Sequence, residues 1–251
     1  MVNFFRKTRK NLAHENKSAK YLRYAVGEII LVVFGILIAL SINNWNENRK
    51  SKKMANEVYT NLLTSLVQDS IEVQRTIDYI SKSLKTQKKI ILNTSDQYTK
   101  GFSQNDMEKM VKEIGWGVIS FFPKTGVYDL ITSNNGMDLL QSKKIKPLLI
   151  NLYDFQYKRY ENVDAIIDNK YHFQLGSLIR KKMGFIEEFN ADFERIPMKH
   201  IDPILFKKHY KELVSECQDM YVLLSSGEKN LFIIRKSINV LTHLIRTELK
   251  K

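Results

Sequence analysis

Side chains able to do chemistry are few in this sequence, and their spacing matches no common type of site. The histidines are His14, His172, His200, His209 and His243. None is four residues from another, the spacing that places two metal ligands on one helical face. His200, Asp202 and His209 are close in sequence, but Pro203 marks a helix start between them. The single cysteine, Cys217, excludes an internal disulfide and a cysteine-based zinc site.

Signatures of catalysis are also missing from the sequence. It contains neither a glycine-rich phosphate-binding loop nor a Gly-x-Ser-x-Gly nucleophile elbow. Paired carboxylates such as Glu187 and Glu188 lie among polar residues, so we expect them at the surface. We therefore predict no catalytic, metal-binding or cofactor-binding residues, and we predict that the protein is not an enzyme.

Glu28 is the ionisable residue whose position most needs an explanation, because it lies at the start of the longest apolar run. Residues 29–42 carry no charge. Gly35 and Ala39 follow Glu28 at a spacing that, at about 100° per residue, places all three within roughly 20° of one line along a helix. Small residues four apart let another helix approach closely, so Glu28, Gly35 and Ala39 form a candidate intramembrane packing face. The alternative is that Glu28 reaches headgroup water and pairs with Arg23.

The element that positions Glu28 is a predicted transmembrane helix over residues 24–45. Tyr24 and Trp45 enclose this stretch, which as a helix is about 32 Å long, close to the thickness of a bilayer's apolar core. Tyrosine and tryptophan favour the two membrane interfaces, so Tyr24, Trp45 and Arg23 are the predicted interface anchors. A cleaved signal peptide remains an alternative, with Ala39 and Ser41 as the small residues before the cut.

Charge predicts the orientation of this helix and its first partner. The chain carries a formal net charge of +13, and residues 1–23 alone hold seven Lys and Arg against one Glu. This basic segment favours a cytoplasmic N-terminus at a bacterial inner membrane, with the C-terminal part in the periplasm. Attraction to the lipid bilayer explains the basic cluster, and the dispersed remaining charge predicts no nucleic-acid binding.

The N-terminal sequence also matches a known pattern. The stretch FFRKTRKNLAHENKSAKYLRYAVGEIILVVFGILIALSINNWNENRK resembles the signature FFRK…YAxGEIxLVVxGILIAL…NNWNE of a family of uncharacterised bacterial single-pass membrane proteins, a domain of unknown function. A second stretch, TGVYDLITSNNGMDLLQSKKIKPLLINLYDFQYKRY, is similar to a later segment of that family. The resemblance implies a single-pass inner-membrane protein with a helical extracytoplasmic domain, and it implies no activity.

The remaining sequence predicts an all-α fold. Proline and glycine are scarce, with 4 and 10 residues, and apolar residues recur at helical spacing. We expect a basic cytoplasmic segment (1–23), the transmembrane helix (24–45), a long helix continuing from it (46–92) and a helical periplasmic domain (93–251) that packs on 46–92. Residues 66, 73 and 80 form a heptad-like apolar stripe, with Ser70 and Gln87 as polar interruptions. Such a stripe packs inside its own domain or forms a coiled-coil stalk between subunits.

Aromatic residues mark the candidate ligand or partner surface. Trp116, Phe121 and Phe122 lie in the glycine-rich stretch GWGVISFFPKTG. Tyr153, Tyr157 and Tyr160 share a face of a second long helix predicted over residues 143–183. The alternative is that both sets belong to the core. Helices are also expected at 203–224 and 229–249, joined at SSGE, and GFIEEFNADFERIP is expected to be a short amphipathic helix or loop.

Two functions fit these features. The first is a membrane-anchored helical interaction or scaffold module that binds copies of itself or another membrane protein. The alternative is a periplasmic ligand-sensing helical bundle that signals through a partner, with the aromatic residues lining a pocket between helices.

Overall fold

The fold is known from a computed structural model, which describes residues 18–93, 102–133, 136–140, 142–184, 188–196 and 201–250. Most of the predicted basic segment 1–23 lies outside these residues. The chain forms two compact units, Met1–Asn56 (unit 1) and Glu57–Lys251 (unit 2), and the division falls within the predicted long helix 46–92.

The longest element is helix α2, Ser18–Leu92, which belongs to both units. Its sequence contains no proline, and its two glycines, Gly27 and Gly35, both lie in the apolar part. Lys89 in the last turn complements the negative end of the helix dipole. The predicted helix that continues past the apolar run is therefore confirmed.

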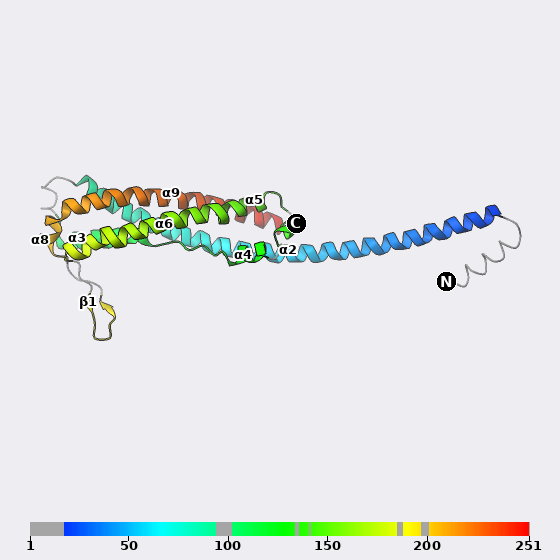
Figure 1. The fold of residues 1–251 in the computed structure, drawn as a ribbon, viewed down its shortest axis with the longest axis horizontal. Helices are drawn as coiled ribbons and strands as arrows, with labels where there is room; N and C mark the ends of the chain where they lie inside the picture. Colours follow the sequence, from blue (N-terminus) through cyan, green and yellow to red (C-terminus); the bar gives the residue numbers. More distant parts are fainter. Residues whose placement is uncertain are drawn as a thin grey trace. The chain divides into compact units, whose positions relative to one another are not determined.

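Unit 2 is built on three long helical segments that lie side by side (Figure 1). The first is α2 from Glu57 onward. The second runs without a break through α5 (Ile145–Ile150), η4 (Asn151–Tyr157), α6 (Lys158–Lys170), η5 (Tyr171–Leu175) and α7 (Gly176–Lys182), where η4 and η5 are π-helical. The third is α9, Tyr210–Glu248. The second long helix is thus confirmed, with two π-helical stretches that the sequence did not indicate.

Helix α9 corrects the expected break at SSGE. Gly227 lies within the helix, and a Cβ at this position would be 3.0 Å from Cδ1 of Ile167 on α6. The glycine therefore permits close packing of α9 on α6 and does not end a helix.

Shorter elements cover the ends and one side of the three segments. They are α3 (Gln104–Gly115), η2 (Trp116–Val118), α4 (Gly126–Ser133), η3 (Gly136–Leu139) and α8 (Pro203–Lys208). Ser103 is the N-cap of α3 and forms a capping box with Asp106. Asp202 caps α8, where Pro203 needs no backbone donor.

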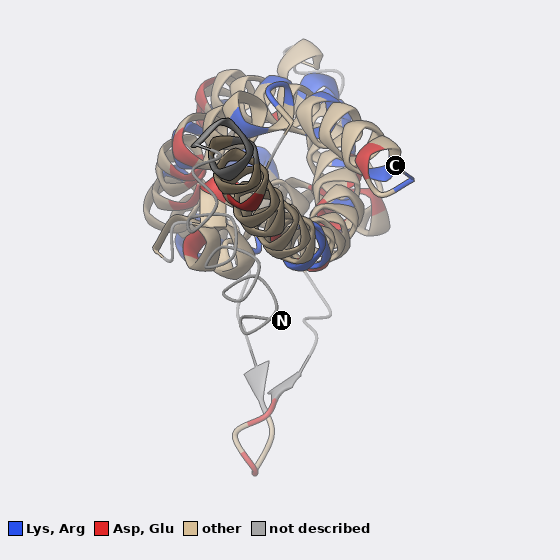
Figure 2. Ribbon diagram, turned by 90° about the vertical axis from the view of Figure 1, so that its right-hand side faces the viewer, with Lys and Arg blue, Asp and Glu red and all other residues tan. Residues whose placement is uncertain are grey.

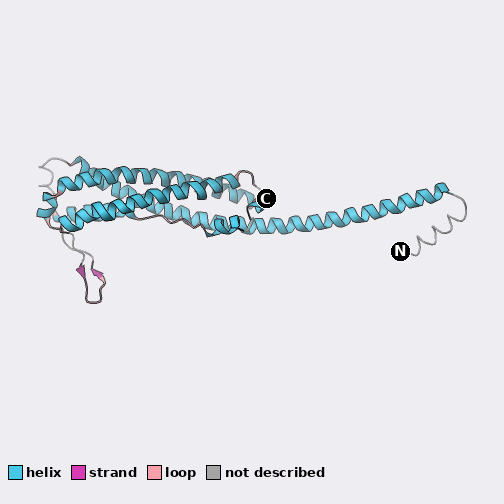
Figure 3. Ribbon diagram, in the orientation of Figure 1, coloured by secondary structure: helices cyan, strands magenta, loops and turns pink. Residues whose placement is uncertain are grey.

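The stretch GFIEEFNADFERIP contains a hairpin and no amphipathic helix. Strands β1 (Glu188–Phe189) and β2 (Arg195–Ile196) pair antiparallel, with Glu188 opposite Ile196 (Figure 3). The Asn190 side chain accepts hydrogen bonds from the backbone of Asp192 and Glu194, which stabilises the turn locally. Apart from this hairpin, the regular elements of the described residues are helical, so the predicted all-α class is confirmed.

The core of unit 2 includes the apolar stripe of α2. Leu66, Val73 and Ile80 are buried among the helices of unit 2. At the position between Leu66 and Val73 the buried polar residue is Asp69 and not Ser70, which is half-buried. Gln87 is buried as expected. Lysine, arginine and acidic residues lie around the helices of unit 2 without gathering on one side (Figure 2).

Candidate functional site

The apolar stretch of α2 is not covered by any part of the described chain. Large apolar side chains from Ile29 to Ile42 are 47–65% exposed, although such residues are normally buried. This helix is long and apolar enough to cross a membrane, and it lies near the N-terminus, where a signal sequence has the same properties.

The predicted interface anchors lie at the ends of this stretch. Tyr24 and Trp45 are both exposed. The Arg49 guanidinium lies over the Trp45 ring, 5.3 Å from its centroid, which adds a cation–π contact at the C-terminal end. The side chain of Arg23 lies outside the described part of the structure.

The predicted packing face is open in a single chain. A Cβ placed on Gly35 would meet no atom within 4 Å, and Ala39 is exposed. Glu28, at the start of this face, is half-buried. A second helix therefore has access to the small residues of this face.

Four of the six predicted aromatic surface residues meet in the interior of unit 2. Phe121, Tyr153, Tyr157 and Tyr160 join Tyr128, and each is only 1–4% exposed. The ring centroids of Phe121 are 5.7 Å from Tyr157 and 6.1 Å from Tyr160. Tyr153 stands edge-on to Tyr157 at 5.0 Å and is stacked on Tyr128 at 4.3 Å. These rings fill the space between helices by packing on one another.

The other two aromatic residues lie elsewhere. Trp116 contacts Tyr79 of α2 at 6.2 Å between ring centroids, and the Lys82 ammonium lies 5.2 Å from the Trp116 ring. Phe122 is 78% exposed. The six residues therefore do not form one surface: neighbours in sequence, Phe121 and Phe122, lie on opposite sides of the chain that carries them.

A buried carboxylate that sequence reasoning missed anchors the aromatic cluster. Asp69 of α2 is 0% exposed. Its Oδ1 accepts a hydrogen bond from the Lys124 backbone N–H at 3.0 Å, and its Oδ2 accepts one from the Tyr157 hydroxyl at 2.9 Å. Burial raises the pKa of the Asp69 carboxyl above its ordinary value, while these two hydrogen bonds and the Lys124 charge lower it less.

Asp164 of α6 also binds a tyrosine, but it is half-buried rather than fully buried. It accepts a hydrogen bond from the Tyr160 hydroxyl at 3.2 Å and is hydrogen-bonded to the Ser120 side chain. Burial raises its pKa, the Ser120 and Tyr160 hydrogen bonds lower it, and the Asp168 charge raises it further. Two tyrosine–aspartate pairs therefore lie on either side of Phe121.

The π-helix η4 supplies Tyr157 of the first pair and also the neighbouring Tyr153. Its residue Tyr153 has a buried hydroxyl with no hydrogen-bond partner among the described residues. Tyr128 donates to Asp154 of η4 at 2.7 Å. Burial raises the pKa of the Tyr153 and Tyr157 hydroxyls far above the ordinary tyrosine value, so both hydroxyls remain protonated at physiological pH. π-Helical turns are frequent at functional sites, which makes this cluster the candidate site within unit 2.

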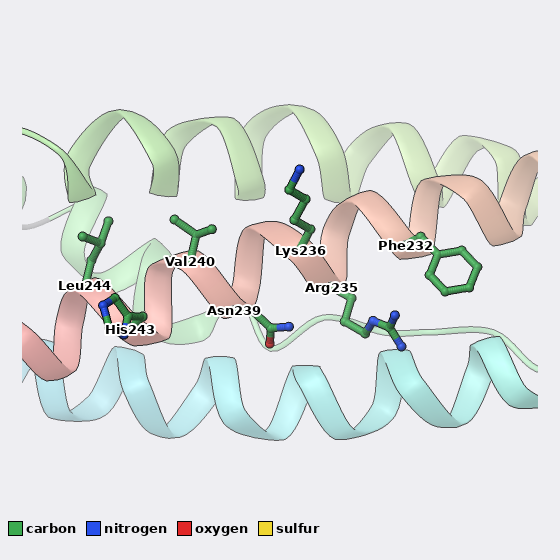
Figure 4. A pocket seen from close by; sticks show the side chains of 7 residues that line it. All are labelled: Phe232, Arg235, Lys236, Asn239, Val240, His243 and Leu244. Carbon is green, nitrogen blue, oxygen red and sulfur yellow. The ribbon is translucent and has the colours of Figure 1, made fainter.

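A shallow groove of about 600 Å³ lies on α9 (Figure 4). Its lining residues are Phe232, Arg235, Lys236, Asn239, Val240, His243 and Leu244. Figure 4 shows Arg235 and Asn239 on one side of the helix and Lys236 and Val240 on the other. The charged side chains do not converge, and no residue of the aromatic cluster lines this groove.

Nucleophilic and metal-binding groups are scarce among the described residues. Burial raises the pKa of the Cys217 thiol to about 12, so it is not a thiolate at neutral pH. Within the described ranges, no three His, Cys, Asp or Glu residues come close enough to hold a metal ion.

Comparison with known proteins places this chain in a family. A family of unknown function, DUF6090, matches residues 28–189, which is more than half of the chain. The chain belongs to this family. The matched part begins at Glu28 and ends in β1, so it includes most of the apolar stretch, Asp69, the aromatic cluster and both π-helices. The predicted membership of an uncharacterised family is thus confirmed, whereas the FFRK start of the signature precedes the match.

Two further searches returned nothing. No curated protein and no solved structure matches the chain.

Proposed function

We propose that the protein is a single-pass, membrane-anchored helical interaction or scaffold module. The observation that carries this proposal is the exposure of every large apolar side chain from Ile29 to Ile42. Removing one such side chain from water contributes about 1.5–3 kcal/mol. Covering a run of this length would gain more free energy than the net stability of a typical domain, which favours coverage by lipid or a partner.

The continuity of α2 supports an uncleaved anchor over a signal peptide. The helix runs from Ser18 to Leu92, and its last part supplies core residues of unit 2 such as Leu62 and Ile80. A cut after Ser41 would fall in the middle of this helix. The basic residues before Tyr24 favour a cytoplasmic N-terminus and a periplasmic unit 2 at a bacterial inner membrane.

The partner is a second copy of this chain or another membrane protein, bound through the face of Glu28, Gly35 and Ala39. The open space beside Gly35 supports this assignment, because small residues let a second helix approach closely. The ligand-sensing alternative has less support, because Phe121, Tyr153, Tyr157 and Tyr160 pack on one another.

Anchoring is tested with C-terminally tagged full-length protein in bacterial membranes. We expect the protein to remain in the membrane pellet after extraction with alkaline carbonate, at the mass of the uncut chain. Release into the supernatant, or a mass corresponding to a cut near Ser41, would contradict the proposal.

A further inference from the structure

The segment 119–125 belongs to neither helix nor strand and runs lengthwise along unit 2 between η2 and α4 (Figure 3). We call it the strap. Four contacts hold it on the helices beneath. The Lys124 N–H donates to Asp69 of α2, Ser120 is hydrogen-bonded to Asp164 of α6, and the Phe121 ring packs on Tyr157 and Tyr160.

The same two tyrosines connect these contacts. Tyr157 donates to Asp69, and Tyr160 donates to Asp164. Each carboxyl therefore binds the strap on one side and a tyrosine under the strap on the other. Phe121 lies between the two pairs, so releasing either carboxyl from the strap also weakens the packing of its ring.

We propose that the strap is a proton-responsive cover: it closes tightly over Tyr157 and Tyr160 when Asp69 and Asp164 are protonated, and it opens more readily when they are ionised. Opening exposes the rings of Tyr157 and Tyr160 and both carboxyls to water. The proposal goes beyond membrane anchoring and does not depend on it.

The sign of the pH dependence follows from burial. With the strap closed, desolvation raises the pKa of both carboxyls, whereas in the open state water restores their ordinary values. The closed state therefore binds protons more tightly. The free energy by which proton binding favours the closed strap is complete below the ordinary aspartate pKa. It is lost as pH rises through the raised pKa values of the two carboxyls.

Few charged or titratable groups lie near Asp69 and Asp164, and their effects are part of the pKa directions given above. Lys124, Tyr157 and Tyr153 face Asp69, and Tyr160 and Asp168 act on Asp164. For each unit by which burial raises the pKa of one carboxyl, the opening constant grows about tenfold between low and high pH.

The test is hydrogen–deuterium exchange of full-length protein in detergent micelles from pH 4, near the ordinary aspartate pKa, to pH 8, corrected for intrinsic exchange rates. We expect the opening constant of amides 119–126 to rise with pH across this range. Amides of α9 around Ile238, which is fully buried, should show no such rise.

Asp69→Asn imitates the protonated carboxyl, because its amide oxygen can accept from the Lys124 N–H and its amide nitrogen can donate to the Tyr157 oxygen. This variant should reduce the pH dependence, and adding Asp164→Asn should abolish it. The matched control is Asp78→Asn, an exposed carboxyl on the same helix, which should keep the wild-type slope.

Three outcomes would overturn the proposal: a wild-type strap with pH-independent protection, an Asp69→Asn variant with the wild-type slope, or a slope in α9 equal to that of the strap. If Asp69→Asn does not fold, Tyr157→Phe replaces it. This change removes a hydrogen bond that lowers the Asp69 pKa, so the rise in opening should move to higher pH. If the opening constant of this variant rises at the same pH as in the wild type, the proposal is also overturned.

Discussion

At the scale of single residues, Asp69 shows how far a sequence can be interpreted. After Leu66, a helix permits the next inward position to be three or four residues later, so both Asp69 and Ser70 fit a stripe that continues at Val73. The seven-residue spacing of Ser70 from Ile77 and Leu84 favoured Ser70 for the stripe. The structure buries Asp69 because Lys124 and Tyr157 satisfy its oxygens, and these donors are 55 and 88 residues away. No local pattern reveals such partners.

Replacing Tyr157 with phenylalanine tests the contribution of this pair to stability. The change leaves Oδ2 of a buried carboxylate without its donor, so we expect a loss of about 1–3 kcal/mol in the free energy of unfolding at pH 7. Urea denaturation of the micelle-bound protein measures it.

Two variants serve as controls for this prediction. Tyr221 on α9 is half-buried, and Tyr221→Phe should change the free energy of unfolding by less than about 0.5 kcal/mol. In an Asp69→Asn background, the cost of Tyr157→Phe should fall because no charge is buried. An equal cost in both backgrounds would show that the hydroxyl does not act through the carboxylate.

At the scale of elements, the predictions succeeded where local composition decides and failed where close packing decides. The absence of proline predicted the length of α2, and apolar periodicity predicted the second long helix and the helical character of α9 on either side of SSGE. Gly227 in α9 does not end a helix, although SSGE suggests an end from sequence, because its missing side chain makes room for Ile167. The hairpin was missed because each strand has only two residues, too few for an alternating pattern.

Gly117 provides a test of this packing role. A Cβ at this position would be 2.7 Å from Cδ1 of Leu224 and 2.8 Å from Oγ of Ser83. Ser83 cannot move freely, because it donates to the Ile114 carbonyl and accepts from Gln87. We expect Gly117→Ala to lower the free energy of unfolding by about 1–3 kcal/mol through overpacking.

The control for this variant is Gly126→Ala at the start of α4, where a Cβ would meet nothing within 4 Å. Thermal unfolding followed by circular dichroism compares the two. Similar midpoints for both variants would show that η2 adjusts without cost.

At the scale of the whole molecule, the sequence predicted the class of fold, the exposed apolar helix and the family. It could not predict which aromatic residues meet, because Phe121 and Phe122 have the same chemistry and opposite environments. Nor could it indicate which carboxyls hold the strap, since Asp69 and Asp164 are 95 residues apart and belong to different helices.

Self-association through the apolar helix is the prediction that belongs to this scale. Glu28→Gln should weaken association between copies in lipid vesicles, measured by energy transfer between labelled chains. Leu37→Ala, about 160° from Gly35 around the helix, should leave association unchanged. Equal behaviour of the two variants would assign Glu28 to the membrane interface only.

The placement of the two tryptophans has a practical consequence. Trp45 lies in unit 1 beside Arg49, and Trp116 lies in unit 2, a few residues before the strap. Because the chain holds no other tryptophan, each unit carries its own fluorophore. Replacing one with phenylalanine leaves the other as an intrinsic optical reporter. Emission from Trp45 then tests whether unit 1 enters lipid, and emission from Trp116 tests changes in the surroundings of the strap, without any added label.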